Sequence, residues 1–506
     1  MPATAWSKKE PWKSGTWLSG SPGSAEATHS PYAFRMSDAI VVGSGPNGLA
    51  CAAVLARAGV AVTVYEAAET IGGGTRTTEL TEPGLLHDHC SAVHPMGAAS
   101  PVFRELDLTS HGLEWCRPEI DLAHPLDGGT AGVMVRSIDT TARGLGADGK
   151  AWRRMFAATS AGFESLNEDL VEPIIHLPGH PLKLARFGLP TLAPASVTAR
   201  RLSTPEGKAL WGGAAAHSFS PLTQPMSSAI GMALITAGHS QGWPVAKGGS
   251  RAITDALASV IEEAGGRIET GRPVRSISEL PPTDAVVLDL GPQGVLDLAG
   301  DLLPAGTKKA YRRYRYGPGS FKLDLAVEGG VPWTNEACRR AGTVHVAGTF
   351  EEMVFSEAEV NRSRMPDRPF ILVGQQYLAD PSRSAGNLHP VWAYAHVPNG
   401  YTGDATEAML RQLERFAPGL RERIVSTATT ATGELARINA NYVGGDIACG
   451  ANTPRQLIAR PRLTLNPYRT GADGIYICSA ATPPGAGIHG MGGANAARTV
   501  LRDFSY

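Results

Sequence analysis

Near its start the chain places a glycine-rich turn between two strand-like runs, and few folds accept this pattern. Residues 38–66 read DAIVVGSGPNGLACAAVLARAGVAVTVYE. The run AIVV is β-branched and suits a buried parallel strand, whereas the Ala- and Leu-rich stretch up to Ala58 suits a helix that ends at Gly59. A second apolar run then closes on an acidic residue. Strand, glycine turn, helix and strand in this order predict a Rossmann-like α/β unit that binds a dinucleotide.

The glycine spacing assigns a separate task to each position of the turn. Gly43 permits the tight turn, Gly45 lets the backbone approach a pyrophosphate, and Gly48 lets helix and strand pack closely. Pro46 and Asn47 open the predicted helix, whose free N–H groups and partial positive charge favour phosphate binding. We therefore expect these five residues to contact the cofactor.

A second glycine run follows the acidic residue and discriminates between FAD and NAD. Glu66 stands 18 residues beyond the last glycine of the turn and is placed to accept hydrogen bonds from ribose hydroxyls. In IGGGTRT (71–77), Gly73, Gly74 and Thr75 return the chain towards the pyrophosphate, and Arg76 adds a fixed cation. Because domains that bind only NAD do not need this second contact, the segment favours FAD.

With these motifs the sequence resembles the FAD-dependent family of phytoene desaturases, carotenoid isomerases and monoamine oxidases. GIYICSAATPPGAGIHGMGGANAARTVLR (474–502) is similar to the family's C-terminal flavin segment, and 242–277 is similar to its middle FAD segment. The resemblance implies non-covalent FAD, with a strand whose Val274 backbone contacts adenine. It also implies that the C-terminal segment lies beside the flavin ring, with contacts from Ala480, Gly490, Met491, Gly492 and Gly493.

The resemblance extends from Met36 to the end of the chain. It looks closest to the branch named after the pyridine nucleotide-disulphide oxidoreductase domain-containing protein 2, through the stretches 90–106, 314–333 and 441–451. The sequence has no CxxC, so the dithiol of true disulphide reductases is absent. Members of this branch mostly lack an assigned substrate, so the resemblance implies cofactor and fold better than it implies a reaction.

A second GxGxxG, at residues 485–490, does not predict a second dinucleotide site. Such a site requires a further strand and an acidic residue about 20 residues on, and the sequence ends at Tyr506. We therefore expect a single dinucleotide site. The electron acceptor is then oxygen, a quinone, a protein, or a nicotinamide that visits the flavin transiently.

The stretch Gly238-His-Ser240-Gln-Gly242 matches the nucleophile elbow of serine hydrolases. The elbow requires a helix directly after the serine, whereas Trp243 and Pro244 follow the motif here. We interpret this stretch as a loop that crosses between domains. A serine hydrolase remains a remote alternative.

His87, His89, Cys90 and His94 gather in one short segment, so a metal site has to be considered. No matching second group of ligands is evident in the sequence. We therefore predict no metal and interpret most of these side chains as packing residues.

Three side chains are candidates for catalysis. His489 lies in the glycine loop before the C-terminal helix, and His94 lies on the chain that leaves the second glycine run. Imidazole titrates near neutral pH, so either could accept a substrate proton, although both could equally be structural. Lys322 lies in the alternating run FKLDLAV, and the resemblance to amine oxidases, which have a lysine near flavin N5, makes it a weaker candidate.

Composition and charge exclude several classes of protein. The 46 basic residues nearly balance the 47 acidic ones, for a net charge of −1, which argues against nucleic-acid binding. With 42% apolar and 18% charged residues the chain is not a disordered tail. It has no uninterrupted apolar run of about 20 residues, so we expect no transmembrane span, and peripheral membrane contact stays open. Six scattered cysteines and a Ser-, Gly- and Pro-rich start without an apolar signal core suggest the cytoplasm.

The complete prediction is an α/β protein of two domains. Residues 36–112, 242–305 and 440–506 form the FAD-binding domain, 113–241 and 306–439 form a mixed-sheet α+β substrate domain, and 1–35 form a mobile extension. The predicted activity is removal of two hydrogens from a small organic, apolar substrate, with hydride transfer to flavin N5 and, by resemblance alone, a carbon–carbon desaturation. Amine oxidation and flavoprotein isomerisation without net redox remain alternatives.

Overall fold

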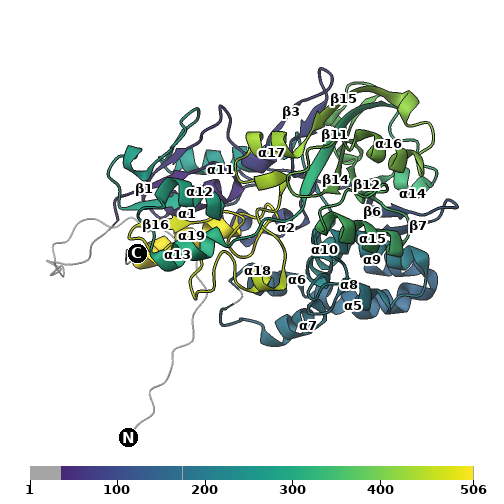
Figure 1. Ribbon diagram of the computed structural model, residues 1–506, viewed down its shortest axis with the longest axis horizontal. Helices are drawn as coiled ribbons and strands as arrows, with labels where there is room; N and C mark the ends of the chain where they lie inside the picture. The colour runs from purple at the N-terminus through teal and green to yellow at the C-terminus, as the bar shows by residue number, and fades with distance from the viewer. Residues whose placement is uncertain (1–35, 174, 505–506) are drawn as a thin grey trace, which may run out of the picture.

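The computed structural model describes residues 36–173 and 175–504, and the extension predicted over residues 1–35 lies outside this part of the chain. Two sheets organise the described residues. A five-stranded parallel sheet lies at the left of Figure 1, and a seven-stranded mixed sheet lies at the right. The α/β prediction, with a second mixed-sheet region, is confirmed.

The parallel sheet has the strand order of a Rossmann fold. Its strands are β1 (Asp38–Val42), β2 (Ala61–Tyr65), β9 (Arg267–Glu269), β10 (Ala285–Leu288) and β16 (Ile475–Ile477). They lie side by side as β9-β2-β1-β10-β16, all parallel, so by chain order they read 3-2-1-4-5. In such a sheet, ligands bind at the carboxyl ends of the two strands where the order reverses, here β1 and β10.

Helices cover both faces of this sheet because its strands are apolar on both sides. On one face lie α1 (Pro46–Arg57), α11 (Arg251–Glu263) and α19 (Met491–Asp503); on the other lie α12 (Pro292–Ala299) and α13 (Ala305–Arg312). Successive strand residues alternate between the two cores, with Val41 in the first and Val42 in the second. The helix predicted to follow the glycine turn is thus confirmed.

The mixed sheet contains the alternating run FKLDLAV of the predicted second domain, which forms most of β11. Its order is β15-β11-β14-β13-β12-β6-β7, and only β12 and β6 pair in parallel. The strands are β6 (Ile120–Pro125), β7 (Ala131–Met134), β11 (Gly319–Glu328), β12 (Ala341–Val346), β13 (Ile371–Gly374), β14 (Leu388–Val397) and β15 (Ile424–Thr430).

The two faces of the mixed sheet differ in polarity. Phe321, Leu323 and Leu325 of β11 face an apolar core shared with α14 (Glu336–Arg339) and α16 (Thr406–Glu414). Lys322 and Asp324, which alternate with them, are buried on the opposite face. That face is covered by the helical part of the chain and by the segment after the second glycine run.

The remaining elements cover or connect the two sheets. The helical region comprises α4 (Ile138–Gly144), α5 (Gly149–Ala161), α6 (Phe163–Leu170), α7 (Pro181–Thr191), α8 (Ala195–Ala199), α9 (Pro205–Ala216), α10 (Ser228–Gln241) and α15 (Phe350–Asn361). Short connecting elements are β3 (Thr77–Glu79), β4 (Leu86–Asp88), α2 (Pro95–Ala98), α3 (Pro101–Glu105), β5 (Trp115–Cys116), β8 (Val245–Ala246), α17 (Thr432–Ile438) and α18 (Pro454–Ile458). No described helix is both long and apolar enough to cross a bilayer.

A buried arginine joins segments that lie far apart in the sequence. Arg383 Nη1 is 2.5 Å from Asp88 Oδ2, and its Nε is 3.2 Å from Asp380 Oδ2. Its Nη2 also donates to the carbonyl of Ala246 at 2.7 Å. The strands of the two sheets come from interleaved parts of the chain, and Arg383 is one of the contacts that hold these parts together. The exact boundaries of the two domains stay a proposal.

Candidate cofactor and substrate site

The glycine turn lies at the carboxyl end of β1, against the start of α19. A Cβ atom on Gly48 would lie closer than 3.0 Å to the carbonyl oxygen of Gly43, so no larger residue fits without moving the backbone. A Cβ atom on Gly493 would meet the backbone of Asn47 equally closely. The first turns of α1 and α19 are therefore in backbone contact, and both helices present their N-terminal ends at the place where the Rossmann fold binds its ligand.

The predicted ribose-binding carboxylate organises the turn. Glu66 Oε2 accepts hydrogen bonds from the backbone N–H of Ser44 at 2.9 Å and from its hydroxyl at 2.6 Å. Glu66 Oε1 accepts from the backbone N–H of Ala68 at 2.9 Å and lies 3.3 Å from Arg76 Nη2. The acidic strand end and the arginine, 10 residues apart in sequence, thus form one buried ion pair beside the turn.

The second glycine run returns to the first, as predicted. Its short 3₁₀ turn spans Gly73–Thr75, and the N–H of Gly72 donates to the carbonyl of Ser44 at 3.0 Å. The side chain of Thr75 contacts Thr254 of α11 at 3.2 Å between hydroxyl oxygens. This places the run between the turn and the middle segment of the chain.

The chemistry of these groups fits a dinucleotide cofactor. Two helix N-termini and the Arg76 guanidinium are suited to a diphosphate, and the Glu66 carboxylate is suited to ribose hydroxyls. Asn47 Oδ1 is buried and has no hydrogen-bond partner among the described residues. An orphaned buried acceptor is costly, so this atom is a natural recipient of a donor from a bound ligand.

One carboxyl group at this site has no counterpart in the prediction. Asp289 directly follows β10, and its Oδ2 accepts the backbone N–H of Gly48 at 3.0 Å. The same oxygen would lie 2.5 Å from a Cβ atom on Gly45. Burial, and to a lesser degree the nearby Glu66 charge, raise the pKa of Asp289 to about 7. Its position directly after the apolar, β-branched run AVVL (285–288) is the sequence signal that could have identified it.

Substituting Asp289→Asn should stabilise the cofactor-free protein in a pH-dependent way. Because the folded-state pKa is raised, the folded protein holds a proton that the unfolded chain has lost between about pH 4 and pH 7. Wild-type stability therefore falls as pH rises through this window, whereas the amide has no charge to bury. We expect a gain of about 2–4 kcal/mol at pH 8 that shrinks to about 1–2 kcal/mol at pH 5 and disappears below pH 4, measured by urea denaturation.

A matched control for this variant is Asp301→Asn, since Asp301 is exposed. This substitution should change stability little at either pH. If Asp289→Asn changed stability equally at pH 5 and pH 8, the pKa of Asp289 would not be raised in the folded protein.

The polar face of the mixed sheet carries a buried charged group. Lys322, which is 2% exposed, forms an ion pair with Asp324, and Asp324 Oδ1 lies 3.2 Å from His87 Nδ1. Burial alone would raise the pKa of Asp324, but the Lys322 charge and the hydrogen bond from His87 lower it. His87 belongs to β4, so the group joins the mixed sheet to the segment that follows the second glycine run.

This face also reaches the second glycine run itself. Tyr394 of β14 stands opposite Lys322 in the strand register. A Cβ atom on Gly74 would clash with the hydroxyl of Tyr442 and would lie 4.0 Å from the Cβ of Cys90. Burial raises the pKa of Cys90, and the positive charge of Lys322 opposes this shift. Gly74, Cys90 and Tyr442 therefore mark the place where the cofactor loops meet the polar face of the mixed sheet.

The two candidate histidines are both occupied by structural partners. His94 Nε2 lies 2.8 Å from the hydroxyl of Ser250. His489 Nδ1 accepts the backbone N–H of Met491 at 3.1 Å and so caps the start of α19. Burial lowers the pKa of both imidazoles to about 4, so both are neutral at physiological pH. Gly490, at φ +67°, forms the N-cap position between His489 and the helix.

Two local predictions were wrong. Val274 lies beyond β9, which ends at Glu269, because Gly271 at φ +63° turns the chain out of the sheet. Ser240 lies in the last turn of α10 rather than in a loop, and the helix ends only at Gly242, at φ +78°. A helix precedes the serine where a nucleophile elbow requires a strand, so the geometry is the reverse of a hydrolase motif.

Ala480 and Gly492, two of the other predicted cofactor-binding residues, lie near the start of α19. Ala480 accepts from Arg460 Nη1 at 3.5 Å in the loop before α19, and Gly492 packs against the carbonyl of Cys478. His89 Nε2 is 2.7 Å from the Thr78 hydroxyl. Within the described residues, no group of three or more His, Cys, Asp or Glu side chains is arranged to hold a metal ion.

Comparisons with known proteins also indicate a Rossmann-like dinucleotide-binding domain in this chain. A family model described as an NAD(P)-binding Rossmann-like domain matches residues 41–106. The chain is similar to pyridine nucleotide-disulfide oxidoreductase domain-containing protein 2 of Rattus norvegicus, with 24% identity over 563 residues that cover 92% of this chain and 94% of the relative. It is also similar to one of the subunits of limonene dehydrogenase from Castellaniella defragrans, with 29% identity over 126 residues, or 24% of this chain and 23% of that protein.

Among solved structures, wild-type putrescine oxidase bound to putrescine has a similar fold. The TM-score is 0.58 at 17% identity, over 93% of this chain and 98% of the other. The predicted resemblance is confirmed: the chain is similar over most of its length to the oxidoreductase domain-containing protein named above, and it shares the fold of putrescine oxidase.

Proposed function

We propose that the chain is an FAD-dependent dehydrogenase that removes two hydrogens from an apolar organic substrate. The observation that carries this proposal is the junction at Gly74, Cys90 and Tyr442. There the loops that suit a dinucleotide meet a sheet face that carries a buried ionic group. The cofactor residues are those of the glycine turn, Glu66, the second glycine run with Arg76, and the first turn of α19.

The side chains beyond the ionic group favour an apolar substrate. Phe219 stacks on His396 with 3.8 Å between ring centroids, and it lies parallel to Tyr394 at 6.2 Å. Trp392 contacts Tyr394 edge-on, and Phe370 contacts His396. Clustered aromatic side chains are suited to contact hydrocarbon rings and chains. The name of the limonene dehydrogenase relative points to the same substrate class.

Bound flavin would supply a hydride acceptor. The protein's own contribution is to orient the substrate, exclude water and hold a proton near the reacting carbon. Lys322 is the candidate for handling that proton, because it lies on the polar face and Asp324 fixes its ammonium group. We assign His94 and His489 to positioning, since each already has a structural hydrogen bond. FAD is expected to be non-covalent, and the electron acceptor is oxygen, a quinone or a transient nicotinamide.

Amine oxidation is the second candidate function. Glu357 is fully buried, and its Oε1 lies 2.8 Å from His396 Nδ1. Its Oε2 has no hydrogen-bond partner among the described residues. A buried carboxylate with a free oxygen beside aromatic rings can bind a substrate ammonium group.

An anaerobic titration distinguishes the two functions and tests the first. We expect purified protein with bound FAD to lose its visible flavin absorbance with unsaturated or saturated terpenoid-like hydrocarbons and to keep it with aliphatic amines. Reduction by amines alone would favour the second function. Reduction by neither class, together with a colourless protein whose stability ignores added FAD, would contradict the proposal.

Removing the buried ionic group should slow the chemical step. The Lys322→Met Asp324→Asn double variant avoids leaving one charge unpaired, which a single substitution would do. We expect flavin reduction by a responsive substrate to slow by about 10²–10⁴ at matched FAD occupancy, the usual effect of losing an acid–base group. The measurement is stopped-flow absorbance, with the exposed Lys309→Met as the control.

The histidine variants complete this test. His94→Ala and His489→Ala should slow reduction less than tenfold, since both imidazoles are neutral and hydrogen-bonded to protein. A larger loss in either variant with normal rates in the Lys322 double variant would reverse the assignment.

A further inference from the structure

Exposed large apolar side chains are concentrated in two segments of the described chain. Nine of the twelve most exposed ones belong to residues 175–197 or 458–465. Leu177 is 98% exposed, Leu182 is 86% exposed and Leu465 is 80% exposed. The nine are Ile175, Leu177, Leu182, Leu189, Leu192, Val197, Ile458, Leu463 and Leu465. Single exposed leucines are ordinary on a protein surface, but a local concentration marks an interaction surface.

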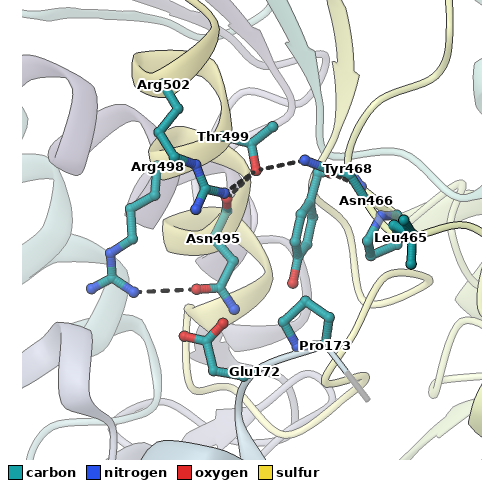
Figure 2. Close-up of a pocket in the computed structure, with 10 residues that line it drawn as sticks. Glu172, Pro173, Leu465, Asn466, Tyr468, Asn495, Arg498, Thr499 and Arg502 are labelled. Atoms are coloured by element: carbon teal, nitrogen blue, oxygen red, sulfur yellow. Dashed lines mark hydrogen bonds between the residues drawn. The ribbon is translucent and has the colours of Figure 1, made fainter. Parts of the chain in front are cut away.

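The two segments adjoin on one side of the molecule. A small pocket is lined by Glu172 and Pro173, which lie just before the first segment, and by Leu465 to Tyr468, at and just beyond the end of the second. Figure 2 shows Pro173 below the ring of Tyr468 and Leu465 to its right, with Arg498 and Arg502 of α19 lining the same pocket. In Figure 1, α7 and α18 both lie in the lower part of the molecule. We call the nine side chains the apolar surface.

The charged residues within the two segments are all basic. Residues 173–205 contain no Asp or Glu but contain Lys183, Arg186, Arg200 and Arg201. Residues 447–472 likewise contain no acidic residue and carry four arginines, of which Arg460 is buried and Arg469 pairs with Asp503. The whole chain has a net charge of −1, so this positive region is local rather than a general property. Asp169 and Glu172 lie just before the first segment, and Asp169 accepts the backbone N–H groups of Gly179 and His180.

Helix α7 has the form of a helix that lies in a membrane interface. Leu182 and Leu189 are seven residues apart and share one exposed face, while Lys183 and Arg186 are exposed beside them. Buried Phe187 packs the opposite face into the core below. With 11 residues the helix is far too short to span a bilayer. Exposed leucines flanked by Lys and Arg are typical of segments that insert shallowly among anionic headgroups.

We infer that the apolar surface docks the protein on a bilayer that contains anionic phospholipid. Leucines would enter the acyl boundary, while the surrounding Lys and Arg side chains would contact phosphate groups. Charge complementarity selects a lipid surface over a second copy of the chain, whose identical positive region would be repelled. The inference goes beyond the proposed function and stands whether or not the substrate is a hydrocarbon.

Vesicle co-sedimentation of the full chain tests this inference. The probes are vesicles of phosphatidylcholine alone and vesicles with about one third phosphatidylglycerol. We expect binding to the anionic vesicles that weakens at high salt, because the headgroup attraction is screened. The Leu177→Gln Leu182→Gln Leu189→Gln variant should bind at least tenfold more weakly, whereas Lys183→Gln Arg186→Gln should lose only the preference for phosphatidylglycerol.

A control variant separates a specific surface from general hydrophobicity. Phe355→Gln and Val425→Gln remove side chains that are 63% and 57% exposed elsewhere on the molecule, and they should leave vesicle binding unchanged. All variants should keep the wild-type circular dichroism spectrum and melting temperature. Absence of wild-type binding to both vesicle types would overturn the inference. So would a leucine variant that binds vesicles normally but converts a dimer into a monomer, since the surface would then join two copies of the chain.

Discussion

Gly48→Ala is expected to abolish FAD binding. The added Cβ atom would lie closer than 3.0 Å to the backbone oxygen of Gly43 and would also press on the side chain of Asp289. Backbone cannot rotate away as a flexible side chain would, so either the turn or α1 has to shift. Both form the expected cofactor site, and we expect at least a hundredfold weaker FAD binding, or about 2.7 kcal/mol.

The measurement is FAD content after purification, followed by fluorescence titration of the cofactor-free protein. Gly306→Ala is the matched control, because a Cβ atom there meets nothing within 4 Å and Gly306 lies within helix α13. That variant should bind FAD normally and be slightly more stable. Normal FAD affinity in Gly48→Ala would mean that the turn does not hold the cofactor.

Arg383→Met should destabilise the protein by about 3–5 kcal/mol. The guanidinium is fully buried between Asp88 and Asp380 and donates to a backbone carbonyl. Burial alone would raise the pKa of Asp88, but the Arg383 charge and the backbone N–H of Ser250 lower it. Removing the cation leaves a buried carboxylate without its counter-ion, which is among the costliest single changes in a protein.

Urea denaturation at neutral pH measures this loss. Arg340→Met is the control, because Arg340 and Glu119 form an exposed ion pair whose removal should cost less than about 1 kcal/mol. The Arg383→Met Asp88→Asn double variant should recover part of the stability, since one unpaired charge is removed with its partner. If Arg383→Met lost no more stability than Arg340→Met, the buried ion pair would not stabilise the fold as proposed.

Both predictions depend on contacts that differ greatly in sequence separation. The clash at Gly48 involves a residue five positions away, and the helix start that it disrupts was evident from local spacing. Arg383 and Asp88 are 295 positions apart, and nothing in either local segment indicates the pairing. A buried arginine is rare, so neither composition nor periodicity favours a buried position for Arg383 over an exposed one.

The same difference between local and long-range contacts explains the two wrong predictions. Ser240 was expected in a loop because Gly242 and Pro244 disfavour a helix, yet those residues act only after α10 has ended. Val274 was expected in a strand because the family resemblance implies a strand there, yet β9 pairs with β2 over only three positions. In both cases the type of element was read from neighbouring residues, whereas its end was decided by packing against other parts of the chain.

By itself the sequence determined the local unit of strand, glycine turn, helix and acidic strand end. Each step of that unit depends on backbone freedom, helix capping or residue alternation within a few positions, so the residues carry the information directly. The alternation of FKLDLAV likewise predicted a strand with one polar face. The sequence could not show which elements pack against each face of that strand.

Only the tertiary structure decided that Asp289 would lie against the glycine turn, and that Lys322 and Asp324 would meet His87. It also decided that the exposed leucines of two segments nearly 300 residues apart would form one apolar surface. These groups come together because parallel strands from separated segments align their carboxyl ends and because helices must bury their apolar faces. Charge, burial and distance at such junctions are properties of the assembled layers, and no single stretch of the chain contains them.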